Sequence, residues 1–350
     1  MSSSADPLDV TLVIPGRNAA GTVAACLDAA TKLLGRDGLQ EIIFVDDGST
    51  DATAEIVSEY PVRCIRGVGK GPGAARNLGW RAAETPLVWF IDADCVPQPD
   101  ALRHLQASFD DENVAGVGGS YNNLRADSLL ACLIHEEIVA RHGAMPRDVN
   151  FLGSFNVVYR RQALAEVGGF DEVRVNGPGR AGAEDAELAC RMCEHRFQLH
   201  FEPASRVGHF HPTRWISYMR TQCRHGYFRV AMYLRHPARV KGDSYSGWLD
   251  FAQPPLAMLS IAFLPLSLWP PMRMVEVVAL VLLAALQIPM TMRMLRRRRS
   301  MTMLAYAPMG FLRAFHRGIG MTAAVLQHGL GILPMIPRIP PGRRTPVRDC

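Results

Sequence analysis

Acidic residues and lysines are scarce in the last hundred positions of this 350-residue chain. Residues 251–350 hold twelve arginines, no lysine, and only two acids, Glu276 and Asp349. Of the 38 basic and 33 acidic residues in the whole chain, 26 and 31 therefore lie in the first 250 positions. An acidic first part followed by a basic, apolar second part is typical of a soluble domain joined to a membrane-associated region. The arginines flank apolar runs instead of alternating with aromatic residues, so we expect no nucleic-acid partner.

Cysteine is also scarce. Eight cysteines are scattered along the chain without a dense framework, which excludes a small disulfide-stabilised secreted scaffold. The first nine residues are polar and acidic and show no secretory signal, so we expect a reducing, cytoplasmic compartment for the first part of the chain. A hydrophobic content of 48% with 20% charged residues excludes a disordered or collagen-like chain.

Short apolar runs alternate with helical patterns over the first hundred residues. The runs predict buried strands at 10–14, 41–45, 62–65 and 87–91, with helices at 22–34, 51–60 and 74–83 between them. Strands joined by helices in this way form a parallel sheet. We therefore predict an α/β, Rossmann-like fold with a mostly parallel sheet, whose ligands bind beyond the carboxyl ends of the strands.

Polar residues follow three of these strands. Asn18 follows the first strand, Asp46 and Asp47 the second, and Asp92 and Asp94 the fourth. Any one of these side chains could simply cap a turn or a helix. Three clusters at corresponding strand ends favour a ligand site instead, and two carboxylates two positions apart suit Mg²⁺ or Mn²⁺, which in turn binds a diphosphate.

A glycine-rich segment, 67–73, precedes the third helix. Backbone N–H groups of such a loop can bind phosphate, but Pro72 and the order Lys70-Gly71 fit neither of the common phosphate-binding motifs. A flexible surface connection is the alternative. With Lys70 and Arg76, the segment would offer positive charge beside the predicted diphosphate.

Further motifs stand in a fixed order up to about Trp215. They are Val-Ile-Pro-x-x-Asn at 13–18, Val-Asp-Asp-Gly-Ser-Thr-Asp at 45–51, Gly-x-x-x-Ala-Arg-Asn-x-Gly at 71–79, Asp-x-Asp at 92–94, Gly-Gly-Phe-Asp-Glu at 168–172 and Glu-Asp at 184–185. In this combination the chain resembles family 2 glycosyltransferases, which have the GT-A fold. A lone Asp-x-Asp would carry little weight.

The resemblance implies a site for a nucleoside-diphosphate sugar. The residues that it places at the donor are Pro15, Asn18, Asp46, Asp47, Arg76 and Asp92. Asp94 matches the metal ligand, Asp185 the catalytic base and Glu184 its companion. Asn156 is expected at the donor or acceptor sugar, and a histidine, His209 in preference to His211, is expected to complete the metal site.

The chemistry of sugar transfer needs the same division of roles. Negative charge collects on the leaving diphosphate, so a cation held by Asp94 stabilises the transition state. The acceptor hydroxyl needs a carboxylate to take its proton, and Asp185 is the candidate. A single displacement with the base opposite the leaving group inverts the anomeric carbon. The alternative for Glu184 and Asp185 is a purely structural role in the first turn of a helix over 183–197.

Processive polysaccharide synthases carry a Gln-x-x-Arg-Trp motif downstream of the base. Here Gln222 is followed by His225 and Gly226 at the corresponding positions. We therefore predict the addition of one sugar, or of a few.

The second part of the chain holds two long apolar segments, near 251–271 and 274–292. Prolines interrupt the first, and the nineteen residues of the second, with Glu276 as their one ionisable group, would rise about 28 Å as a helix, close to the ~30 Å of a hydrocarbon core. Arginines at 293 and 296–299 follow directly, and positive residues stay on the cytoplasmic side. We predict a hairpin of two membrane spans; a buried hairpin of a soluble protein is the alternative.

Residues 301–337 form a third, less uniform segment. Arg313, His316 and Arg317 interrupt it, so an amphipathic segment at the membrane interface and an imperfect third span both stay open.

We therefore predict a GT-A domain over residues 1–240, a membrane-associated helical region over 251–337 and a basic disordered tail over 338–350. The predicted function is an inverting, Mg²⁺- or Mn²⁺-dependent transfer of a sugar from a nucleoside-diphosphate sugar to a hydroxyl of a glycan or lipid acceptor. The predicted location is the cell inner membrane, with the catalytic domain in the cytoplasm. A nucleotidyltransferase and an inactive, membrane-tethered nucleotide-sugar binding protein are the alternatives.

Overall fold

The computed structural model describes residues 7–172, 182–237, 240 and 242–329, and within these ranges the chain forms two compact units. The first unit comprises residues up to Leu124 and Pro146–Phe210, and the second comprises Arg125–Met145 and the described residues from His211 onward. These units separate regions of dense packing, and their limits differ from the predicted boundary near residue 240. That boundary between a catalytic domain and a membrane-associated region stays a prediction. The predicted tail at 338–350 lies outside the described residues.

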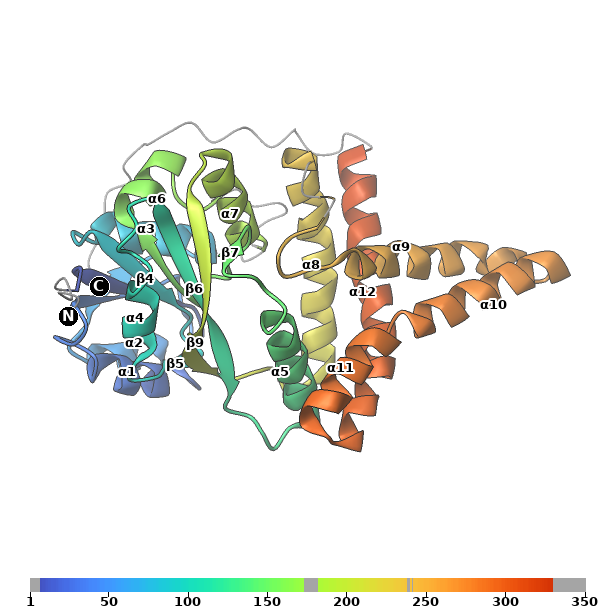
Figure 1. The fold of residues 1–350 in the computed structure, drawn as a ribbon, viewed down its shortest axis with the longest axis horizontal. Helices are drawn as coiled ribbons and strands as arrows, with labels where there is room; N and C mark the ends of the chain where they lie inside the picture. Colours follow the sequence, from blue (N-terminus) through green and yellow to red (C-terminus); the bar gives the residue numbers. More distant parts are fainter. Residues whose placement is uncertain (1–6, 173–181, 238–239, 241, 330–350) are drawn as a thin grey trace. The chain divides into compact units, whose positions relative to one another are not determined.

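The first unit is built on one mixed sheet with helices on both of its faces (Figure 1). Its strands are β1 (Val10–Gly16), β2 (Leu39–Asp46), β3 (Arg63–Arg66), β4 (Leu87–Ile91), β5 (Cys95–Pro97), β6 (Val114–Asn123), β7 (Asp148–Val149), β8 (Asn156–Arg160) and β9 (Gln198–His209). Its helices are α1 (Val23–Thr31), α2 (Thr53–Ser58), α3 (Pro72–Ala82), α4 (Ala101–Gln106), α6 (Arg161–Val167) and α7 (Glu184–Glu194).

The strands follow the order β3-β2-β1-β4-β8-β6-β9-β5, and β7 pairs with β9. β3, β2, β1 and β4 are mutually parallel, as the alternation of strands and helices predicts. β8 is antiparallel to both β4 and β6, whereas β9 is parallel to β6. The carboxyl ends of β1, β2 and β4 therefore open at one edge of the sheet, where the predicted ligand residues follow them.

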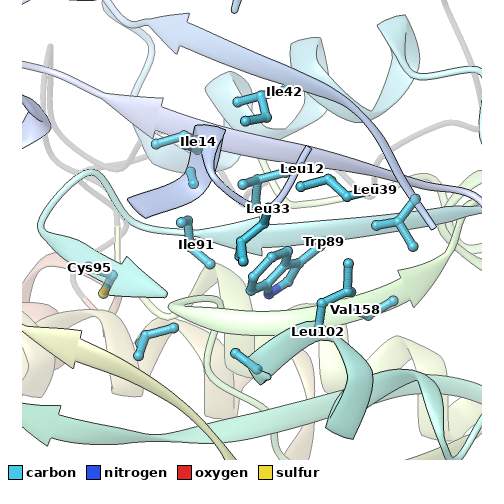
Figure 2. Packing of buried hydrophobic residues seen from close by; sticks show 14 of the residues in the cluster. Leu12, Ile14, Leu33, Leu39, Ile42, Trp89, Ile91, Cys95, Leu102 and Val158 are labelled. Carbon is cyan, nitrogen blue, oxygen red and sulfur yellow. The ribbon is translucent and has the colours of Figure 1, made fainter. Parts of the chain in front are cut away.

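The central strands are apolar along their whole length because both faces are covered by helices. Figure 2 shows one of these two layers, in which Leu12, Trp89 and Val158 of three strands pack with Leu33 and Leu102 from the helical side. All five side chains are at most 4% exposed. Burial on this scale, at roughly 25 cal/mol per Å² of apolar surface, fixes the strand ends from which the site is built.

The apolar run at 198–201 followed by Pro203 predicts a strand that ends in a turn, but Pro203 lies within β9. The register between β6 and β9 shifts between Gly118 and Ser120, which pair with Phe201 and Arg206. The extra residues of β9 around Pro203 therefore form a bulge, where proline is tolerated because it need not donate to a neighbouring strand. Beyond the bulge the strand continues to His209, which it carries to the site.

The second unit is helical. Its elements are α5 (Leu129–His142), α8 (Trp215–Arg235), α9 (Trp248–Phe263), the 3₁₀ turn η2 (Leu264–Leu266), α10 (Pro270–Ala285), α11 (Ile288–Arg298), the 3₁₀ turn η3 (Met301–Ala305) and α12 (Tyr306–Gly329). α8 and α12 lie side by side, and α9 and α10 form a hairpin that packs against α12 (Figure 1). Two stretches of the described chain, Trp248–Leu266 and Pro270–Arg298, are long and apolar enough to cross a membrane.

Candidate active site

Two buried acids stand in sequence here, Asp46 at the end of β2 and Asp47 in the loop after it. Asp46 Oδ1 accepts a hydrogen bond from the backbone N–H of Ser49 at 2.9 Å. Asp47 accepts hydrogen bonds from two N–H groups of the glycine-rich segment, that of Lys70 at 2.8 Å and that of Gly71 at 2.6 Å. Gly71 has a φ of +96°, a conformation that favours glycine. Asp47 thus fastens the glycine-rich segment to the end of β2, and its contact with a nucleoside stays a prediction.

Asn18 joins the loops after β1 and β2. Its backbone N–H donates to Ser49 Oγ at 2.9 Å, and its Oδ1 accepts from the N–H of Thr50 at 2.8 Å. Pro15 lies three residues earlier, buried inside β1, while the Lys70 side chain is exposed. The structure therefore gathers the predicted donor residues of the first two strands at one edge of the sheet.

Asp94, Cys95 and His209 form the metal-ligand cluster of the described residues. One potential ligand atom from each lies within 4.8 Å of the others, and His209 Nε2 is 3.4 Å from Asp94 Oδ2. Burial by itself would raise the pKa of Asp94, but the hydrogen bond and charge of His209 lower it below its ordinary value. Burial raises the pKa of the Cys95 thiol well above its ordinary value, which makes the thiol a poor ligand. A carboxylate and an imidazole suit Mn²⁺, so these residues fit the predicted cation.

Arg76 connects the Asp-x-Asp motif with the start of α7. Its Nη2 donates to Asp92 Oδ1 at 2.7 Å and its Nη1 donates to Glu184 Oε1 at 2.9 Å. The Arg76 side chain is 5% exposed, and its guanidinium lies over the Phe170 ring. Burial and the charge of Asp94 raise the pKa of Asp92, whereas Arg76 opposes this shift. Arg76 thus links two predicted site residues, Asp92 and Glu184, through its two terminal nitrogen atoms.

Asp185 lies in the first turn of α7, beside Glu184. Burial, followed by the negative charge of Glu184, raises the pKa of Asp185 to about 7. A carboxylate with a pKa near 7 is poised to accept a proton at neutral pH. Gly153 lies close by, because a Cβ added to it would come 3.9 Å from Asp185 Oδ2. Asp185 Oδ1 also accepts a hydrogen bond from the backbone N–H of Ala186 at 2.7 Å, a contact in the first turn of the helix that agrees with the alternative, structural role.

A row of aromatic rings runs beside these residues and has no counterpart in the motifs. Tyr121 of β6 stacks on Phe155, with ring centroids 3.5 Å apart, and lies 4.9 Å from the His209 ring. Phe155 in turn lies against Gly153, the neighbour of Asp185. No spacing in the sequence reveals this row, because its members come from separate strands and loops.

Two residues have different surroundings from those expected. Asn156 is fully buried, and its amide accepts from Trp89 Nε1 at 3.0 Å and donates to Ser205 Oγ at 3.1 Å. These contacts hold the side chain in the core, and the contact of Asn156 with a sugar stays a prediction. The pair Arg160-Arg161 is typical of a solvated helix start, but Arg160 donates to the carbonyl oxygens of Val114 and Phe109, both at 2.8 Å.

The fold and this arrangement define a GT-A type of domain, in which acids follow the ends of parallel strands and two further acids begin the helix α7. Residues 11–168 match the model of Glycosyl transferase family 2. Residues 11–168 therefore belong to glycosyl transferase family 2, and the GT-A fold expected from the motifs is confirmed.

Two curated relatives and one solved structure illustrate the similarity. The pre-mycofactocin glycosyltransferase of Mycobacterium tuberculosis is 30% identical over 266 residues, which cover 69% of this chain and 52% of that protein. The probable glycosyltransferase YdaM of Bacillus subtilis is 27% identical over 232 residues, which cover 61% of this chain and 54% of that protein. The chain thus spans about half the length of these relatives. The mannosyltransferase PcManGT of Pyrobaculum calidifontis, solved with GDP-Man and Mn²⁺, matches with a TM-score of 0.51 and 20% identity over 93% of this chain and 86% of that one.

Proposed function

We propose that the protein transfers a sugar from a nucleoside-diphosphate sugar to an acceptor hydroxyl, with inversion at the anomeric carbon. The observation that carries the proposal is the chain of contacts from Asp92 through Arg76 to Glu184, which brings Asp185 to the Asp-x-Asp motif. Family membership and the GT-A fold support the same reaction.

The described residues divide the work of this reaction. Asp94 and His209 would hold a divalent cation, Mn²⁺ or Mg²⁺, which supplies positive charge beside the leaving diphosphate. Asp185, with its pKa of about 7, takes the proton of the acceptor hydroxyl as the new bond forms. Arg76 keeps Asp92 and the start of α7 in register, which fixes the base relative to the donor side.

We also propose that the hairpin of α9 and α10 enters a membrane. Apolar side chains near the turn of this hairpin are exposed to solvent: Leu268 is 88% and Trp269 62% exposed. From Leu283, which is fully buried, α10 extends thirteen residues back to Pro270, or about 20 Å. Exposed apolar surface of this extent is unstable in water and stable in lipid. We place the sheet-bearing unit at the cytoplasmic side of the inner membrane, where nucleotide sugars are made available, with a lipid-linked or envelope glycan as acceptor.

The reaction is tested by incubating the detergent-extracted protein with a panel of nucleotide sugars and Mn²⁺, with membrane lipid extract as the source of acceptor. Release of a nucleoside diphosphate is expected with one donor, together with transfer of the labelled sugar. Release of pyrophosphate would instead identify a nucleotidyltransferase. No turnover of any donor, with Asp185→Asn leaving the cellular role intact, would favour an inactive nucleotide-sugar binding protein.

A further inference from the structure

A buried network of charges links three helices of the second unit. Glu137 of α5 accepts a hydrogen bond from Arg141 Nη2 at 2.7 Å and a very short one from Arg313 of α12. Arg141 also binds both carboxylate oxygens of Asp250, at the start of α9, each at 2.7 Å. Two carboxylates are thus shared by two guanidinium groups, and these four charges balance.

Arg317 adds a positive charge that this network does not balance. It lies one turn after Arg313 on α12, and its Nε donates to the neutral Gln222 Oε1 of α8 at 2.8 Å. Among the residues that the structure describes, no carboxylate lies within ion-pair distance of Arg317. Burial and the charge of Arg313 lower the pKa of Arg317 to about 10, although Tyr218 and the carboxylate of Glu137 oppose this shift. An arginine whose charged form is destabilised in this way gains from a bound anion.

The positive region also reaches the surface. Arg317 is only partly buried, and so is Arg229 of α8. His225 of α8 is exposed at the surface, and the charges of Arg317, Arg224 and Arg229 act to lower its pKa. Helices α8 and α12 approach so closely that a Cβ at Gly226 would clash with the backbone of Arg317. Arg317 therefore stands on a rigid helix crossing, and part of the residue is exposed.

The place of Arg317 along the hairpin points to the class of ligand. Its neighbour Gly318 packs against Pro254 and Met258 of α9. Apart from Trp248 at the start of α9, the large apolar side chains of this helix become exposed from Leu259 onward, about 8 Å beyond Pro254. A membrane that receives the hairpin has its headgroups at the level where this exposure begins, and the phosphate is the anionic part of a lipid headgroup. Guanidinium groups bind phosphate oxygens with paired, charge-assisted hydrogen bonds.

We propose that Arg317 binds the phosphate monoester of a membrane lipid. Arg229 of α8 is already paired with Asp243, whose Oδ2 lies 3.3 Å from its Nη2. The inference rests on the proposed entry of the hairpin into a membrane and is independent of the proposed sugar transfer.

Vesicle binding by the full chain tests this proposal. The probes are phosphatidylcholine vesicles alone, and the same vesicles with 10 mol% of either phosphatidic acid or a polyprenyl monophosphate. We expect the unchanged protein to bind at least one of the two phosphomonoester vesicles more tightly than phosphatidylcholine alone. Arg317→Gln should bind that vesicle about tenfold more weakly than the unchanged protein does. Arg220→Gln, at an exposed position of the same helix α8, is the matched control and should bind like the unchanged protein. Equal binding by both variants, or equal losses in both, would overturn the proposal.

The two lipid probes and free phosphate separate the sources of the ligand. If the protein prefers the polyprenyl monophosphate, the ligand is a lipid carrier. If it binds both lipids equally, it recognises the phosphate headgroup alone. Either result supports the site. The lipid assignment is wrong if inorganic phosphate at millimolar concentration binds Arg317 while the phosphomonoester vesicles bind the protein no more tightly than phosphatidylcholine vesicles do.

A second measurement needs no variant. Phenylglyoxal modifies accessible arginines, and mass spectrometry reads the extent at each one. The phosphate-bearing lipid is expected to slow modification of Arg317 severalfold and to leave Arg220 unchanged; equal modification with and without lipid contradicts the proposal. Donor turnover is measured on the same samples. If the unchanged protein turns over a donor but does not bind the phosphomonoester lipid, the lipid-site inference is wrong and the proposed reaction stands. If it binds the lipid but turns over no donor, the proposed reaction is wrong and the lipid site stands.

Discussion

Replacing Asp185 by asparagine removes the proposed base and leaves the shape of the site nearly unchanged. General base catalysis contributes about 10²–10⁴ in rate, so kcat should fall by this factor while donor binding persists. The pKa of about 7 adds a pH dependence, because only the carboxylate form accepts a proton. Below that pKa the rate of the unchanged protein should fall about tenfold per pH unit. A bound cation favours the carboxylate, so the inflection is expected at or below pH 7.

The same substitution should have the opposite effect on stability. The raised pKa means that folded Asp185 holds its proton more tightly than the unfolded chain does, so its contribution is favourable at low pH and is lost as pH rises through about 7. At pH 8 the neutral asparagine avoids this cost, and the thermal midpoint of Asp185→Asn should equal or exceed that of the unchanged protein. A loss of activity without a loss of stability separates a catalytic role from a capping role.

The assay is the initial rate of nucleoside diphosphate release between pH 5 and 9, with Mn²⁺ and saturating donor. Glu194→Gln, an exposed acid at the other end of α7, is the control and should keep both rate and profile. A rate for Asp185→Asn within threefold of the unchanged protein, or a pH profile that the substitution leaves in place, would refute the assignment of Asp185 as the base.

Three further outcomes follow from the contacts of particular side chains. Arg76→Lys cannot bridge Asp92 and Glu184 together, so donor turnover should drop more than tenfold; nucleotide binding and circular dichroism distinguish this from unfolding, and unchanged turnover contradicts the bridging role. Asn156→Ala leaves the buried donor of Trp89 without its acceptor and should lower the free energy of unfolding by about 1–3 kcal/mol in urea titration, whereas a sugar-binding role predicts a raised KM with unchanged stability. Trp269 at the hairpin turn should shift its fluorescence to shorter wavelength when vesicles are added, and Trp269→Phe should lose most of this shift; an unchanged spectrum contradicts membrane entry.

The parts of the fold that follow local patterns could be predicted from the sequence. β4 has the predicted bounds, 87–91, because a continuous apolar run between polar residues fits only a strand buried on both faces. β9 was harder to foresee, because Pro203 is an ordinary turn signal and only the pairing with β6 shows that a bulge accommodates it. Local rules of proline placement cannot supply that pairing.

The site shows the same limit more strongly. Asp92, Asp94 and Asp185 stand out because their spacing forms motifs, whereas the partners of these residues come from far along the chain. Arg76 reads in the sequence as a cation for phosphate, and the structure gives it two carboxylates, one of them 108 residues away. Asn156 reads as a polar residue for a ligand, yet packing places its amide between two core groups. Long-range contacts, and not residue type, decide these roles.

The charge of the site yields a last prediction, on the order of binding. Within the described residues, Asp92, Asp94, Glu184 and Asp185 supply four carboxyl groups, and Arg76 is the guanidinium that pairs with two of them. A nucleoside diphosphate is itself an anion, so this surplus of negative charge opposes its binding until a divalent cation is held at Asp94 and His209.

Metal removal should therefore abolish nucleotide binding as well as turnover. Isothermal titration with a nucleoside diphosphate should show binding with Mn²⁺ and a loss of at least tenfold after chelation, whereas the uncharged nucleoside should bind weakly and equally in both. Asp94→Asn removes one negative charge as well as a ligand, so its residual nucleotide affinity should no longer respond to Mn²⁺. Nucleotide binding of equal strength with and without the cation would mean that the diphosphate lies away from these carboxylates, and the arrangement proposed for donor and base would then be wrong.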